Sequence, residues 1–126
     1  MKKFLLVFFI SFLITFDLSA LTPNSSIVGI WSLARIKAPN TKKFDTPVYK
    51  MTYHFFDDGN LVINNLSFRE RTFWTWGISK KGILRIQSKS SKSRFVGKVY
   101  FKSKNIFIYS LFFKDKKKYI WIFQRM

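Results

Sequence analysis

Few residues in this sequence could carry out catalysis, and His54 is the only histidine. A nucleophilic triad would have to combine it with a serine and one of the scattered aspartates, yet no serine has the spacing of a nucleophile elbow. Asp57 and Asp58 are adjacent and would point apart, and the run from Asp57 to Asn60 is typical of a tight hairpin because its Asp-Gly supplies the positive φ of such turns. We therefore expect no catalytic residue and no enzymatic activity.

Metal and cofactor sites are not predicted either. The chain contains no cysteine, which excludes thiolate ligands and disulfide bonds. Its six acidic residues do not have the spacing of an oxygen-rich cation loop, and no glycine-rich phosphate-binding loop is present. The function has to be sought in binding, with no cofactor and no metal.

The first twenty residues have the order of features found in a secretory signal peptide. Lys2 and Lys3 precede an uncharged apolar run, Phe4–Phe16, and a short polar stretch then ends at the small residue Ala20. The run is shorter than the roughly 20 apolar residues that span a membrane. We expect cleavage after Ala20, so that residues 1–20 form a signal-peptide helix and residues 21–126 a periplasmic or secreted domain without a transmembrane segment.

The chain is strongly basic, with a formal net charge of +17, and the leader accounts for only one unit of it. Such a field attracts anionic partners: envelope polymers, lipid headgroups or an acidic protein. Export argues against nucleic acid. The alternative is a lysine-rich solvent face with no partner. The basic residues expected to form an anion-binding surface are Lys89, Lys92, Arg94, Lys98, Lys102, Lys104, Lys114, Lys116, Lys117 and Lys118.

After the leader, short apolar runs alternate with turn residues, and no sustained helical spacing interrupts them. Single helical turns are conceivable only within residues 37–47 or 66–71. The pattern predicts about eight strands: Ile27–Ile36, Val48–Phe56, Leu61–Asn65, Arg71–Ile78, Ile83–Gln87, Phe95–Phe101, Ile106–Phe113 and Tyr119–Arg125.

Most of these runs have one apolar and one polar face, as strands of an antiparallel sheet do. In the second run, for example, the apolar face of Tyr53 and Phe55 opposes His54. About eight such strands in sequence order close most simply into an up-and-down barrel without edges. A transmembrane barrel would need longer strands and an apolar outer band, whereas Lys98 and other basic residues lie in mid-strand here.

Three features resemble the lipocalin-like superfamily, in particular its short bacterial domains. They are the Gly29-x-Trp31 that opens the first strand, the hairpin that runs from Tyr53 to Gly59, and a last strand ending in Arg125. The resemblance implies a lipocalin-like barrel over residues 21–126, in which Trp31 plugs the closed end and Arg125 packs over its indole. The Thr-Asp-Tyr motif of full-length lipocalins is missing.

A barrel of about eight strands is either filled by side chains or holds one small ligand. We expect a small apolar or amphiphilic ligand, with a filled core as the alternative. If Trp31 points inward, alternation places Leu33 inward too, together with the candidate ligand-binding residues Tyr49, Met51, Tyr53, Phe55, Trp74, Trp76, Val99 and Phe101. The run Ile106–Phe113 is apolar on both faces, which predicts a partner or dimer surface if one face is left uncovered.

Overall fold

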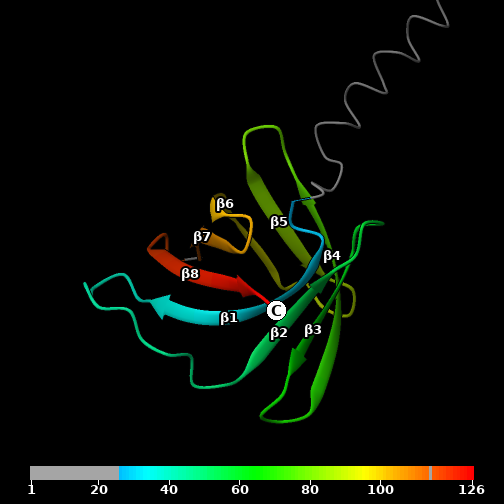
Figure 1. Cartoon of the computed structure of the whole chain (residues 1–126), viewed down its shortest axis with the longest axis horizontal. Coiled ribbons are helices and arrows are strands. Elements are labelled where there is room, and N and C mark those ends of the chain that lie inside the picture. The colour runs from blue at the N-terminus through cyan, green and yellow to red at the C-terminus, as the bar shows by residue number, and fades with distance from the viewer. Residues whose placement is uncertain (1–25, 114) are drawn as a thin grey trace, which may run out of the picture.

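The computed structural model describes residues 26–113 and 115–126, so the predicted leader and Lys114 lie outside the described residues. Eight strands form one closed barrel in sequence order (Figure 1). The strands are β1 (Gly29–Lys37), β2 (Met51–Phe55), β3 (Asn60–Asn65), β4 (Glu70–Ile78), β5 (Ile83–Ser88), β6 (Arg94–Ser103), β7 (Ile106–Phe112) and β8 (Lys118–Arg125).

Every strand pairs antiparallel with its sequence neighbours, and β1 pairs with β8 to close the ring. The predicted all-β, antiparallel barrel of eight strands is thus confirmed. Most strand bounds agree with the predicted ones within two residues. The exception is β2, which begins at Met51 rather than Val48. Neither segment conceivable as a helical turn is helical: residues 38–47 and 66–69 form turns or irregular chain with one isolated β-bridge at Asp45, and the ends of the two predicted ranges belong to β1 and β4.

Local turn chemistry explains the tight hairpin between β2 and β3. Gly59 has a φ of +90°, which is unfavourable for residues with a side chain. Asp58 accepts a hydrogen bond from the Asn60 backbone N–H through Oδ1 at 2.9 Å, and its other carboxylate oxygen accepts one from the Asn60 amide. Both bonds favour the ionised carboxylate and lower the pKa of Asp58. The two aspartates therefore belong to a turn, as their spacing indicates.

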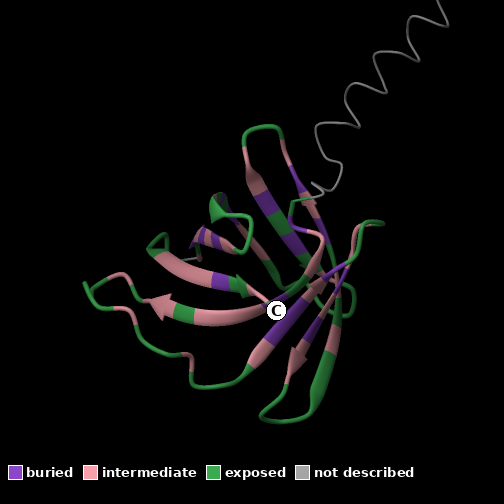
Figure 2. Ribbon diagram, viewed as in Figure 1, coloured by how far each residue is buried: buried purple, intermediate pink, exposed green. Residues whose placement is uncertain are grey.

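The connections divide the barrel into two ends. The hairpins β2–β3, β4–β5 and β6–β7 lie at the same end as the chain entry to β1 and the C-terminus, and we call this the closed end. The other four connections form the open end, and their described residues are 38–50, 66–69, 89–93, 113 and 115–117. Buried and exposed residues alternate along many of the strands (Figure 2), which places one apolar face of the ribbon inside the ring.

Trp31 fills the interior at the closed end. It is 0% exposed, and its ring lies edge-on to Phe107 with the centroids 4.6 Å apart. The indole Nε1 donates a hydrogen bond to the Ile27 carbonyl oxygen at 2.8 Å. Ile27 is itself fully buried and precedes β1, so the chain entry covers this end of the core.

Arg125, the last residue of β8, joins the two strands that close the ring. Its guanidinium carbon lies 4.2 Å from the centroid of the Trp31 ring. Nη1 donates to the Val28 carbonyl at 3.0 Å, Nη2 to that of Ser26 at 2.8 Å, and Nε to that of Lys104 at 3.1 Å. One side chain thus holds the chain entry, the β6–β7 hairpin and the indole together.

Gly29 makes room for this arginine. Its φ is +133°, and a Cβ added to it would lie 2.6 Å from Arg125 Nη1. A side chain here would therefore be strained in the backbone and would also displace the guanidinium. The Gly-x-Trp spacing and the terminal arginine form one contact system.

Replacing Arg125 with methionine should lower the free energy of unfolding by about 2–4 kcal/mol, because a cation–π contact and three hydrogen bonds are lost while the length of the side chain is kept. Denaturant unfolding followed by tryptophan fluorescence measures this. Arg85→Met, at an exposed position on β5, is the matched control and should cost less than about 0.5 kcal/mol. Equal losses in the two variants would contradict the role given to Arg125.

Candidate functional site

A cavity of about 220 Å³ lies inside the barrel toward the open end. Side chains of β2, β3, β4 and β6 form its wall. Half of its lining residues are apolar and half are polar. The apolar ones are Met51, Ile63, Trp74 and Phe95, and the polar ones are Tyr53, Asn65, Glu70 and Thr72.

The sheet register brings these residues together. Met51 pairs with Asn65, which pairs in turn with Glu70, so these three form one row across β2, β3 and β4. Tyr53, Ile63 and Thr72 form the next inward row. The first row is nearer the open end, because Met51 begins β2, Asn65 ends β3 and Glu70 begins β4. The cavity therefore has a polar rim and a deeper row that contains a tyrosine.

Phe95 forms an aromatic wall with its neighbours. Its ring stacks on Trp74 at a centroid distance of 5.6 Å and meets Trp121 and Phe113 at 5.4 and 5.8 Å. Phe95 and Phe113 also line a second, open groove of about 880 Å³. That groove is lined by Lys92, Ser93, Arg94, Phe95, Val96, Phe112, Phe113 and Asp115.

Two of the polar groups in the cavity are fixed by other protein groups. Trp74 Nε1 donates to Thr72 Oγ1 at 2.7 Å, and that hydroxyl donates to the Ile63 carbonyl at 3.3 Å. Asn65 Oδ1 accepts hydrogen bonds from the backbone N–H groups of Ser67 and Phe68 in the β3–β4 turn. These bonds hold the Trp74 indole and the Asn65 amide in place.

Tyr53 differs from the other buried tyrosine on the inner face. It is 3% exposed, and its hydroxyl has no hydrogen-bond partner within residues 26–113 and 115–126. Every fully enclosed side-chain nitrogen or oxygen in that part of the chain has a partner, so the Tyr53 hydroxyl must open onto the cavity. Tyr109, by contrast, donates to the Leu84 carbonyl at 2.9 Å. Burial raises the pKa of both tyrosines, so both hydroxyls keep their protons near neutral pH.

The eight candidate ligand-binding residues fall into three groups. Met51, Tyr53 and Trp74 line the cavity. Four others belong to the hydrophobic core or pack against it: Phe55, Trp76, Val99 and Phe101. Phe55 lies 5.3 Å from Trp76, ring to ring, and Phe101 lies 6.4 Å from Trp31, so the closed end is filled by aromatic side chains.

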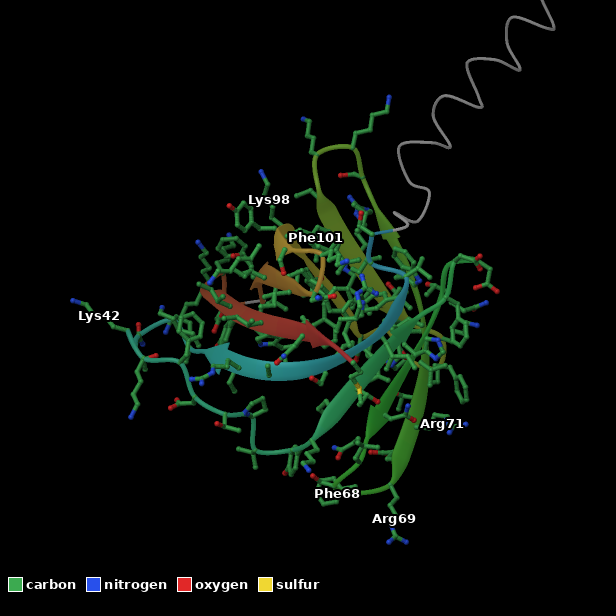
Figure 3. All side chains as sticks on the ribbon, in the orientation of Figure 1. Lys42, Phe68, Arg69, Arg71, Lys98 and Phe101 are labelled. Carbon is green, nitrogen blue, oxygen red and sulfur yellow. The ribbon has the colours of Figure 1, made fainter. Side chains whose placement is uncertain are left out.

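The inward placement of Tyr49 was wrong. Because β2 begins only at Met51, the alternation that put Tyr49 on the inner face does not extend back to it. Tyr49 is 45% exposed, and its ring packs on Phe68 of the β3–β4 turn at 4.8 Å. Figure 3 shows Phe68 and Arg69 at the tip of that turn, away from the barrel interior.

Sequence reasoning missed part of the aromatic wall. Phe95, Phe113, Tyr119 and Trp121 all pack against the core, but none was among the candidate ligand-binding residues. A signal was present for two of them: Phe95 alternates in phase with Val99, and Trp121 alternates in phase with Phe123. Phe113 and Tyr119 flank a lysine-rich turn. Because the ends of the two strands are uncertain from the sequence there, alternation does not decide which face of the sheet either side chain takes.

The structure separates the predicted anion-binding residues into groups. Lys92, Arg94, Lys116, Lys117 and Lys118 lie in or beside the β5–β6 and β7–β8 connections of the open end, whereas Lys102 and Lys104 lie at the β6–β7 hairpin of the closed end.

The remaining three basic residues are separate from these groups or are bound elsewhere. Lys98 extends outward from the middle of β6 (Figure 3). Lys89 begins the β5–β6 connection, and its ammonium group donates a hydrogen bond to the side chain of Asn60. Lys114 lies outside the described residues.

His54 stacks on Phe56 with ring centroids 3.9 Å apart. In the part of the chain that the structure describes, no three metal-ligating side chains come together, and no helix has the length and apolarity needed to cross a membrane. The apolar outer face of β7 is only partly covered, because Ile106 and Ile108 are half-buried while Phe112 is 57% exposed.

The sequence matches no family model and no curated protein sequence. Among solved structures, the barrel is similar to a de novo designed fluorescence-activating β-barrel. The TM-score is 0.53 and the identity 16%, over 81% of this chain and 95% of the designed one. At this identity the likeness supports the barrel fold, and function has to be argued from the cavity.

Replacing Tyr109 with phenylalanine should lower the free energy of unfolding by about 1 kcal/mol, since its hydrogen bond to Leu84 is lost. Tyr53→Phe should change it by less than about 0.5 kcal/mol or stabilise the fold, because the hydroxyl that it removes has no partner in the described chain. Denaturant unfolding compares the two variants directly. A loss at Tyr53 as large as that at Tyr109 would show that the Tyr53 hydroxyl is paired.

Proposed function

We propose that this chain is an exported, lipocalin-like, non-enzymatic protein that binds a small apolar or amphiphilic molecule inside the open end of its barrel. The observation that carries the proposal is the cavity of about 220 Å³ beneath the polar row of Asn65 and Glu70. Binding pockets combine apolar walls with a few convergent polar groups, and the lining here offers both, with four apolar and four polar side chains.

The contrast between the two ends supports this role. At the closed end, Trp31 and its aromatic neighbours fill the interior, which supplies the stability of the fold. At the open end, the interior side chains leave space. The contact of Gly29, Trp31 and Arg125 supports a lipocalin-like assignment, and the charge and apolar pattern of residues 1–20 supports export.

The volume limits the ligand. An apolar cavity of about 150 Å³ is large enough to bind benzene, so about 220 Å³ suits a substituted ring or a short alkyl chain. A longer molecule would have to continue past Phe95 into the adjoining groove. The expected ligand is therefore smaller than the typical contents of a pocket of about 300–1,000 Å³.

Filling the cavity should weaken binding. Ile63→Phe places a larger ring on the inward face of β3 and should weaken binding of a single-ring probe, acetophenone, by about tenfold or more, because overpacking costs about 1–3 kcal/mol. Val62→Phe, on the opposite face of the same strand, is the matched control and should leave affinity unchanged. Calorimetric titration measures both. A parent protein that gives no saturable heat of binding with acetophenone would count against the cavity as a binding site.

A second function is favoured by the basic residues at the open end. Lys92, Arg94 and Lys116–Lys118 lie there next to exposed Phe112. We propose, as the alternative, that this surface binds anionic envelope polymers, lipid headgroups or an acidic partner protein. The two functions do not exclude each other, because one uses the outside of the open end and the other its interior.

Binding through these residues should depend steeply on salt. The chain should bind phosphatidylglycerol vesicles at low ionic strength and leave them at about 0.5 M salt, as measured by co-sedimentation. Exchanging Lys116 and Lys117 for glutamate should weaken binding by at least about tenfold, since each basic residue near an anionic surface contributes about 1 kcal/mol. Exchanging Lys80 and Lys81 at the closed end is the control with the same change of charge. Equal effects of both exchanges would show that net charge, rather than this surface, drives binding.

A further inference from the structure

We propose that the Tyr53 hydroxyl recognises the ligand, and that the cavity selects small, uncharged ring compounds carrying a hydrogen-bond acceptor such as a ketone or aldehyde oxygen. This inference rests on the proposed ligand-binding function and names the chemical class of the ligand. It depends on four properties of the cavity: an unpartnered hydroxyl, a fixed ring, a lining without cations and a flat aromatic wall.

The unpartnered hydroxyl is the central property. Tyr53 is 97% buried, since only 3% of it is exposed, and it lines the cavity without a hydrogen-bond partner in the described chain. A buried polar group without a partner is unfavourable relative to one that is hydrogen-bonded. A ligand that supplies the missing partner therefore gains affinity relative to one of the same shape that does not. A phenol has one proton to donate, so the complementary ligand atom is an acceptor.

The ring of Tyr53 is held so that its hydroxyl points in a defined direction. Phe123 meets it edge-on with centroids 4.8 Å apart, and Phe55 stacks beside it at 6.4 Å. Both phenylalanines are buried in the core. The donor is therefore preorganised, and binding need not restrict a mobile side chain.

The charge of the lining argues for an uncharged ligand. Glu70 is the only charged side chain among the lining residues, and it lies in the outer row with Asn65. An anionic group placed at Tyr53 would lie in the inner row beside Ile63, with no cation in the lining to compensate for its desolvation. A carbonyl oxygen accepts the same hydrogen bond without that cost.

The shape of the wall argues for a planar ring. Trp74 and Phe95 both line the cavity and stack on each other with an angle of 27° between their planes, and Trp74 is fixed by its hydrogen bond to Thr72. Aromatic rings pair favourably in offset-stacked or edge-to-face arrangements, so a ring in the cavity finds an aromatic partner in this pair. A single ring is also the size that the volume of about 220 Å³ accommodates.

A pair of probes of equal shape tests the inference. Acetophenone and α-methylstyrene differ only in that a carbonyl oxygen replaces a methylene group. The apolar α-methylstyrene leaves water more readily than acetophenone, so the quantity to compare between variants is the ratio of the two affinities. Tyr53→Phe should lower the ratio of acetophenone affinity to α-methylstyrene affinity about fivefold to tenfold, the effect of one hydrogen bond in a buried site, because acetophenone loses affinity while α-methylstyrene keeps it. Calorimetric titration reports both affinities.

Tyr109→Phe is the control, because it removes a buried hydroxyl that is already bonded to the Leu84 carbonyl; it should keep the parent ratio. If the probes bind the parent and Tyr53→Phe leaves the ratio unchanged, the role of Tyr53 is overturned while the cavity stands as a ligand site. If Tyr109→Phe lowers the ratio as much as Tyr53→Phe does, the loss is not specific to the cavity hydroxyl, and the inference is again wrong. If neither probe binds the parent at millimolar concentration, both the inference and the proposed function fail.

Discussion

The contact between Arg125 and Trp31 is the interaction on which the rest of this structure depends. With no cysteine in the sequence, no disulfide bond can hold the ends of the sheet together. The ring closes where β1 meets β8, and at that seam the guanidinium covers the indole and binds the chain entry through Val28 and Ser26. Closure of the barrel and burial of its core are therefore coupled at one point.

This arrangement assigns different tasks to the two ends of one small domain. Aromatic packing at the closed end buries enough apolar surface to stabilise the fold, so the open end does not need to be filled. There Phe95 and Trp74 pack as a wall and leave a cavity beside them. A cavity can exist in so short a chain because fully buried side chains elsewhere on the inner face, from Trp31 at the closed end to Leu111 on β7, supply the apolar core.

The sequence predicts the fold well because its information is local. Turn residues such as Gly59 and the alternation within each run define eight strands, and sequence order then leaves a closed meander as the simplest arrangement. Tyr49 shows the limit of this reasoning, since the point at which alternation begins depends on where pairing with β1 and β3 begins. The alternation pattern therefore places a residue on the inner or outer face only where the bounds of the strand are known.

The cavity could not be predicted in the same way. Tyr53 and Tyr109 are both aromatic residues in phase with an apolar face, and the sequence does not distinguish them. What separates them is that Tyr109 reaches a carbonyl of β5, two strands away in the ring, whereas Tyr53 reaches none in the described chain. Such contacts depend on the curvature of the ring and on the volumes of side chains across it, which are non-local properties.

The continuous pairing of the ring has a consequence for how molecules enter and leave. Each of the eight described strands pairs with a neighbour on both sides, so the wall cannot part without breaking a strand pair. The ladder between β1 and β2 covers only Gly29–Ser32, and toward the open end it is followed by an isolated bridge between Ile36 and Asp45. With Trp31 and Ile27 covering the opposite end, molecules would reach the interior from the open end, past the row of Met51, Asn65 and Glu70, and the loops there would control their entry.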